Sequence, residues 1–235
     1  MIDPLRDLAS VREATDRLLA AAAGLDNAAT AGPSRLPGWS RGHVLAHLSR
    51  NAEALVNVLQ GRPMYVSGEA READIERDAP RPLAEHIADV RETAAGFQTA
   101  GAVPADWSRT VELRNGVTDA AARLPFRRLI EVELHHVDLD IGYELEDLPE
   151  EFTDREISFL AQRFSGHADV PPTRIVASDR DSASKDAGEW HTGGTQGSPM
   201  TVTGPAPALL GWLAGRRDGT GLDTAGAALP KLPPL

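Results

Sequence analysis

Four long stretches of the chain carry apolar residues at the spacing of an amphipathic helix, and this periodicity constrains the fold more than any other feature. The stretches cover about residues 3–25, 41–60, 83–100 and 125–145. In each, apolar residues recur three or four positions apart, which places them on one face that must be buried. Because the connections are modest in length, we expect these helices to pack as an antiparallel four-helix bundle.

Beyond the Leu148-Pro149-Glu150 segment the pattern changes. Short alternating segments typical of strands are flanked by two further helices. The predicted elements are a helix over about 153–165, strands at 173–178, 189–192 and 199–204, and a helix over about 206–216. We therefore predict a multidomain α and α+β protein, with a four-helix bundle over residues 1–150 and a smaller α+β domain with an antiparallel sheet over residues 151–235.

Composition narrows the classes of function. The chain has no cysteine, which excludes disulfides, thiolate-held metals and a cysteine nucleophile, so any metal must be held by histidine and carboxylate. Its net charge of -11, without a basic stripe, argues against nucleic acid or an anionic membrane and favours a small-molecule partner. No apolar run is long enough to span a membrane and the N-terminus does not resemble a signal peptide, so we expect a cytoplasmic protein.

The last bundle helix carries polar residues beside its apolar face. Pro125 fits its first turn, and Glu131, His135 and Asp138 follow one another at helical spacing along one stripe. A carboxylate and an imidazole four residues apart can bind one metal ion from the same side of a helix. The alternative is a solvated ion pair that contributes a few tenths of a kcal/mol.

The second helix offers a similar stripe. Ser40 is expected to cap the N-terminus of this helix. His43, His47 and Asn51 form a stripe next to the buried face of the same helix. A lone buried histidine is more often satisfied by a hydrogen bond than used as a ligand, and this alternative applies to His47.

If the second and fourth helices face each other, His47 can meet Glu131 and His135 at one point. Two histidines and one carboxylate, with one or two positions left open, have the composition of a catalytic zinc site. Spacing alone leaves competing ligands open: His43, His136 and Asp138.

Three segments together resemble the mycothiol-dependent maleylpyruvate isomerases: residues 36–48, 131–139 and 210–216. The resemblance spans nearly the whole chain, and it implies a DinB-like N-terminal four-helix bundle followed by a smaller C-terminal α+β domain. It also implies that His47, Glu131 and His135 are the metal ligands. An essential arginine of that family matches Arg216, with the adjacent Arg217 as the alternative. Independently of the family, Arg216 would suit a helix C-terminus.

The resemblance further implies two cofactors, Zn²⁺ and mycothiol, and a cis-trans isomerase that converts maleylpyruvate to fumarylpyruvate. Rotation about the carbon–carbon double bond requires a thiolate to add to the alkene and then leave. The cofactor would supply that sulfur, which suits a chain without cysteine. Arg216 would bind a substrate carboxylate or the developing enolate oxygen.

Two other functions fit the same residues. A mycothiol S-transferase acting on other electrophiles would use the same metal and thiol, whereas a non-enzymatic metal-binding DinB-like protein would need no Arg216. The sequence leaves open which nitrogen- and oxygen-binding metal is used in the cell.

Overall fold

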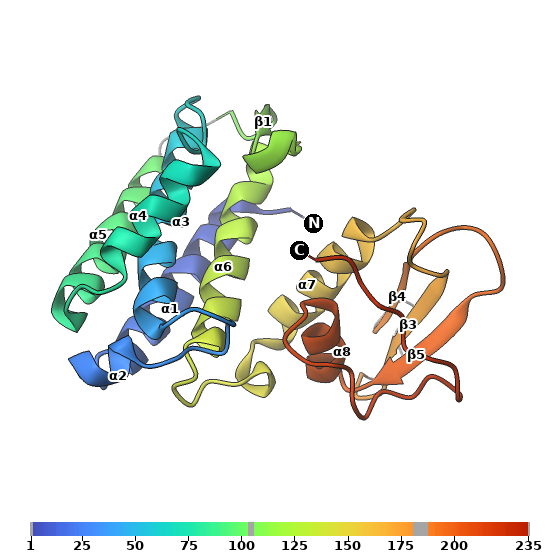
Figure 1. The fold of residues 1–235 in the computed structure, drawn as a ribbon. Helices are drawn as coiled ribbons and strands as arrows, with labels where there is room; N and C mark the ends of the chain where they lie inside the picture. Colours follow the sequence, from blue (N-terminus) through green and yellow to red (C-terminus); the bar gives the residue numbers. More distant parts are fainter. Residues whose placement is uncertain (1, 103–105, 181–187, 235) are drawn as a thin grey trace. The chain divides into compact units, whose positions relative to one another are not determined.

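The computed structural model describes residues 2–102, 106–180 and 188–234, and the chain divides into two compact units, Met1–Tyr143 and Glu144–Leu235. The first unit is mainly helical, with one short pair of strands, and the second mixes helices with a three-stranded sheet (Figure 1). Elements of the first unit, with η for a 3₁₀ helix, are α1 (Pro4–Ala22), α2 (Asn27–Ala31), α3 (Arg41–Leu59), α4 (Gly68–Asp78), α5 (Leu83–Ala102), β1 (Thr110–Glu112), η1 (Arg114–Gly116), β2 (Thr118–Ala120), η2 (Ala121–Arg123) and α6 (Leu124–Asp138). Those of the second are η3 (Leu145–Asp147), α7 (Glu150–Arg163), β3 (Thr173–Ala177), β4 (Glu189–Thr192), β5 (Met200–Gly204) and α8 (Ala206–Leu213).

The four long helices of the first unit form the predicted bundle. α1 packs on α5 and α6, and α3 packs on the same two helices, so the four close around a shared core (Figure 1). Each contributes side chains that are almost fully buried, among them Leu18, Leu48, Phe97 and Val132. Across the described residues, no helix combines the length and the apolar character needed to cross a membrane.

Local signals in the sequence explain where these helices begin. The side chain of Asp3 accepts hydrogen bonds from the first turn of α1, and Pro125 lies in the first turn of α6, where its missing N–H costs nothing. Ser40 caps α3 as predicted, because its Oγ accepts a hydrogen bond from the backbone N–H of His43 at 3.3 Å.

The last bundle helix ends earlier than its apolar periodicity predicts. α6 stops at Asp138, and the φ angles of Asp140 and Gly142 are 55° and 90°. These left-handed conformations end a helix. Ile141 and Leu145 therefore lie beyond α6, and the prediction that the helix continues to about residue 145 was wrong.

The second unit holds a three-stranded sheet in the order β4-β3-β5, covered by α7 and α8, which also contact each other (Figure 1). Ile175 and Val202 lie fully buried on adjacent strands of this sheet. The predicted antiparallel sheet was wrong for one strand pair, because β4 runs antiparallel to β3 but β5 runs parallel to it. The connection at 193–199 does not close a hairpin but crosses the start of β3, where the N–H of Gly194 donates to the Val170 carbonyl at 2.8 Å.

One glycine in the bundle is required by a close approach between helices. Gly42 is the second residue of α3, and a Cβ at this position would lie 2.2 Å from the carbonyl oxygen of Ala79, at the end of α4. Any side chain here must push α4 away from α3. Gly96, inside α5, is the opposite case, because a Cβ there would have no atom within 4 Å.

We predict that the two glycine-to-alanine variants change stability in opposite directions. Gly42→Ala should lower the free energy of unfolding by about 1–3 kcal/mol through the forced backbone shift. Gly96→Ala should raise it by up to about 1 kcal/mol, because alanine is the better helix former. Urea denaturation of both variants and the wild type, followed by circular dichroism, measures this. Equal effects of the two substitutions would contradict the close α3–α4 contact.

Candidate metal centre

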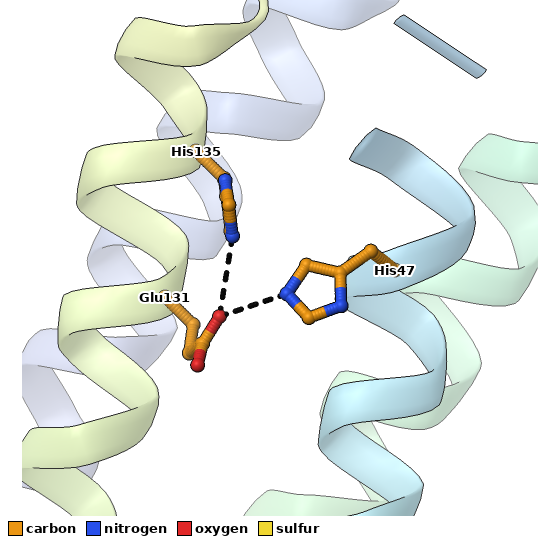
Figure 2. A group of neighbouring side chains, drawn as sticks. All are labelled: His47, Glu131 and His135. Carbon is orange, nitrogen blue, oxygen red and sulfur yellow. Dashed lines mark hydrogen bonds and ion pairs between the residues drawn. The ribbon is translucent and has the colours of Figure 1, made fainter. Parts of the chain in front are cut away.

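Three of the predicted site residues converge inside the bundle. His47 projects from α3 toward Glu131 and His135 of α6, and one potential ligand atom of each lies within 4.8 Å of the others (Figure 2). Glu131 Oε2 is 2.9 Å from His47 Nε2 and 3.3 Å from His135 Nε2. The imidazoles are nearly perpendicular, with ring centroids 4.7 Å apart. Both histidines are buried, whereas the Glu131 side chain is 32% exposed.

The alignment of α3 with α6 depends on Arg41, the first residue of α3. Its Nε donates to the carbonyl of Leu139 at 2.6 Å and its Nη2 donates to the carbonyl of Asp140 at 3.0 Å. A cationic side chain that binds the last carbonyls of a helix also interacts favourably with the helix dipole. Arg41 thus joins the start of α3 to the end of α6, and His47 and His135 lie only a few residues from that junction.

The three competing ligands have other partners. His43 Nδ1 accepts a hydrogen bond from the Ser40 backbone N–H at 3.1 Å, so its ring completes the cap of α3. His136 is buried and stacks on Tyr143, with the ring centroids 4.0 Å apart. Asp138 is fully buried and lies 2.8 Å from His135 Nδ1, on the side of the ring away from Glu131.

Arg71 determines which nitrogen of His47 carries its proton. Arg71 Nη2 lies 3.0 Å from His47 Nδ1, and because a guanidinium can only donate, Nδ1 must accept. Nε2 therefore carries the proton and donates it to Glu131. Burial lowers the pKa of His47 to about 4, more than the Glu131 carboxylate can raise it. His47 is accordingly neutral at neutral pH.

His135 has the opposite electrostatic environment. Burial lowers its pKa, but hydrogen bonds to Asp138 and Glu131 together with their negative charges outweigh burial and leave the pKa raised. Burial likewise raises the pKa of Glu131, but hydrogen bonds from His135 and His47 hold it well below its usual value. The centre thus combines a neutral imidazole, a second imidazole whose pKa is raised, and an ionised carboxylate.

Sequence reasoning did not identify Arg41 or Arg71 as part of the centre. Arg71 lies on the short α4, and nothing in its local pattern marks it out. Arg41 could have been found from its place directly after the N-cap Ser40, but its partners lie almost a hundred positions away.

The predicted arginine in the second unit lies beyond the end of α8. Its helix was predicted to reach Arg216 but ends at Leu213, and Arg216 Nη1 donates to the carbonyl of Ala214 at 2.8 Å. Arg217 forms a bidentate pair with Glu146, with N–O distances of 2.7 and 2.8 Å. The guanidinium of Arg217 is thus engaged by a carboxylate of its own unit.

Two nitrogen donors and one carboxylate form a ligand set that suits zinc. The carboxylate of Asp138 on the second nitrogen of His135 matches the way in which metal-bound histidines are usually oriented. The arrangement can therefore hold a metal ion and leave a position open for a ligand.

Fold and site together define a protein in which a helical bundle with a His, Glu and His cluster is followed by a small α+β unit. Residues 11–140 match the family described as the mycothiol maleylpyruvate isomerase N-terminal domain, and residues 147–233 match the family described as the MDMPI C-terminal domain. The chain belongs to the mycothiol maleylpyruvate isomerase family.

Two solved structures share this fold. A crystal structure of a mycothiol-dependent maleylpyruvate isomerase is 23% identical, with a TM-score of 0.87 over 99% of this chain and 97% of that one. A histidine-to-alanine mutant described by the same enzyme name is 22% identical, with a TM-score of 0.86 over the same shares. Among curated proteins, no relative gives a significant match.

We predict that the two histidines titrate differently in protein freed of bound metal. Imidazole ¹⁵N spectra should show His47 neutral, with its proton on Nε2, down to about pH 4, and His135 still doubly protonated at pH 6.5. His47 in the unfolded chain takes up a proton near pH 6.5, so acidification from there to about pH 4 should favour unfolding, by up to about 3 kcal/mol. His135 acts in the opposite sense: its stabilisation is present below pH 6.5 and is lost as the pH rises through its raised pKa.

Comparison with a His47→Gln variant identifies the His47 resonances. The free energy of unfolding of this variant should lack the pH dependence that His47 contributes. Protonation of the His47 ring near pH 6.5, or a proton on its Nδ1, would contradict the hydrogen bond from Arg71.

Proposed function

We propose that this chain is a zinc- and mycothiol-dependent cis-trans isomerase that converts maleylpyruvate to fumarylpyruvate. The observation that carries the proposal is the convergence of His47, Glu131 and His135 from two helices of a bundle that belongs to this family. The names of the two similar solved structures support the reaction and the thiol. The chain's lack of cysteine agrees with an external sulfur.

The three residues have distinct roles in this proposal. His47 and His135 bind the ion through Nε2, the atoms that face each other across Glu131, and Glu131 provides the third ligand. Asp138 holds the His135 ring in place through Nδ1. When bound, the ion keeps the mycothiol sulfur as a thiolate, the nucleophile that adds to the double bond and leaves after rotation.

His47 must exchange its proton for the ion. A neutral imidazole that uses Nε2 as a ligand carries its proton on Nδ1, where it cannot face the donors of Arg71. Arg71 would therefore have to give up its contact with Nδ1 for His47 to hold an ion through Nε2. The Trp39 ring, whose centroid lies 5.6 Å from that of His47, stays as an apolar wall beside the ligand.

In the second unit, Arg216 is proposed to bind a substrate carboxylate or the enolate oxygen that develops during addition. Its guanidinium presents several donors in a plane, a geometry that suits a carboxylate. Arg217, which is paired with Glu146, is the less suitable of the two adjacent arginines.

We predict that the purified protein holds about one zinc ion per chain through these three side chains. His135→Ala and His47→Ala should each lose the metal while keeping the helical circular dichroism spectrum. His43→Ala serves as the matched control and should keep the metal, because His43 caps α3. Metal analysis of the four proteins measures this. Metal retained by His135→Ala, or lost from His43→Ala, would point to another ligand set.

We predict that the zinc-loaded protein converts maleylpyruvate to fumarylpyruvate only when mycothiol is present. Arg216→Ala should reduce kcat/KM by about a hundredfold or more, in the range for a lost charged donor to the transition state. Arg217→Ala is the control and should change it much less. The absorbance change of the substrate on isomerisation measures the rate.

The same assay separates the competing functions. Conjugation of mycothiol to other electrophiles, with maleylpyruvate left unchanged, would favour a mycothiol S-transferase. Metal binding without either reaction would favour a non-enzymatic metal-binding protein.

A further inference from the structure

The first unit contains a pocket that none of the proposed ligands lines. Its volume is about 600 Å³, and it lies between the segment after α3 and the β1–β2 hairpin. Residues 58–68 form one side and residues 109–116 the other. Pockets of this volume accommodate small organic molecules.

The charged residues of this pocket are mainly cationic, although the chain as a whole is acidic. Arg62, Arg109 and Arg114 line it, with Glu112 as the single carboxylate, whereas the net charge of the chain is -11. Local positive charge in an acidic protein favours an anionic ligand.

Two of these arginines have neutral partners, so their charges are not cancelled. Arg62 donates to the side-chain oxygen of Asn57 at 2.6 Å, and Arg109 donates to the carbonyls of Val58 and Leu59 at 2.9 and 2.6 Å. Arg114 is exposed in the η1 turn, and within the described residues its guanidinium has neither a hydrogen bond nor an ion pair. Arg114 is therefore the cation best able to bind a ligand in this pocket.

Tyr65 connects the pocket with the candidate metal centre. It lines the pocket, and the guanidinium carbon of Arg71 lies 5.9 Å from the centroid of its ring. The same guanidinium is 3.0 Å from His47 Nδ1. Burial raises the pKa of Tyr65, so its hydroxyl keeps a proton that it can donate to an anion.

A further buried cation, Arg128, lies close enough to Tyr65 to interact with it electrostatically. Arg128 precedes Glu131 by one helical turn and is fully buried, with Nη1 bonded to the Leu48 carbonyl at 2.8 Å. Its Nε and Nη2 have no hydrogen-bond partner among the described residues. Burial lowers its pKa to about 10, against the effects of Glu131 and Tyr65, so it is still charged at neutral pH.

We propose that this pocket binds a carboxylate group of a small dicarboxylate, with Arg114 as the principal binding residue. The identity of the ligand as the isomerase substrate rests on the proposed function, since that substrate carries two carboxylates on a short carbon chain. The path from Tyr65 through Arg71 to His47 places this anion site beside the metal centre. Arg114 is then a specificity residue that selects anionic over neutral electrophiles.

The test is the affinity of maleate, measured by calorimetry on the full-length protein as purified, without mycothiol so that no turnover occurs. Arg114→Glu should weaken maleate binding about tenfold or more, as expected for a lost charge-assisted hydrogen bond. Arg114→Lys, which keeps the charge, should restore most of the affinity. Dimethyl maleate, which keeps the carbon skeleton without charge, should bind at least about tenfold more weakly than maleate to the wild type.

Arg91→Glu is the matched control. Arg91 is exposed on α5, outside the pocket, and its replacement changes the net charge by the same amount. It should leave the maleate affinity within about twofold of the wild type, because distant surface charges are screened. Equal effects of the two reversals, no effect of Arg114→Glu, or no maleate binding by the wild type would each overturn the proposal.

Failure of this proposal can be distinguished from failure of the proposed function. If the wild type isomerises maleylpyruvate and Arg114→Glu leaves KM and maleate affinity unchanged, the pocket assignment is wrong and the function stands. If maleate binding depends on Arg114 but no isomerisation occurs, the pocket assignment is supported and the proposed function fails.

Discussion

The packing of α3 against α6 is the constraint on which the candidate metal centre depends. Each helix alone presents only part of a ligand set, and a shift of one turn, about 5 Å, would separate His47 from Glu131. The apolar faces bring the two helices together, but they fix the position of one helix along the axis of the other only loosely. Arg41 supplies a directional contact, because its hydrogen bonds to the two carbonyls directly after α6, those of Leu139 and Asp140, are satisfied at only one position along the helix axis.

The two histidines differ in chemistry because of residues that were not expected to be ligands. Arg71 forces Nδ1 of His47 to accept, whereas Asp138 accepts from Nδ1 of His135. The pKa of one ring is therefore lowered and that of the other is raised, although both contact the same oxygen of Glu131. For metal binding the two rings have different requirements: His135 has to give up one proton and keep its partner, whereas His47 has to change both its tautomer and its partner.

The helical architecture could be predicted from the sequence because it follows from local spacing, whereas the choice of His47, Glu131 and His135 among the candidate ligands came from the family resemblance. Apolar periodicity identified the bundle helices, and Ser40 was recognised as a cap. The end of α6 was missed because Ile141 and Leu145 continue the apolar period, although Asp140 and Gly142 adopt left-handed conformations that stop the helix. Periodicity reports which face is buried, not whether the backbone between apolar residues stays helical.

The errors in the second unit and at the centre have a different origin, because they concern contacts between distant residues. Strand signals located β4 and β5 correctly, but pairing depends on whether the connection turns back or crosses the start of β3. Hydrogen bonds such as those of Arg41 and Arg71 join elements far apart in the chain, and no local pattern records them.

The distribution of charge in the first unit links the metal centre to the arginine-lined pocket. A bound divalent cation would favour anionic ligands nearby, but Glu131, whose lowered pKa keeps it ionised, would offset part of its charge. A dicarboxylate approaching a chain of net charge -11 is repelled over most of the surface. Positive charge must therefore be concentrated where the anion is proposed to bind: Arg62, Arg109 and Arg114 line the same pocket as Tyr65, and Arg71 lies over the Tyr65 ring. If an ion at His47 displaces Arg71, its guanidinium becomes available beside this pocket, so that metal binding and anion binding would reinforce each other.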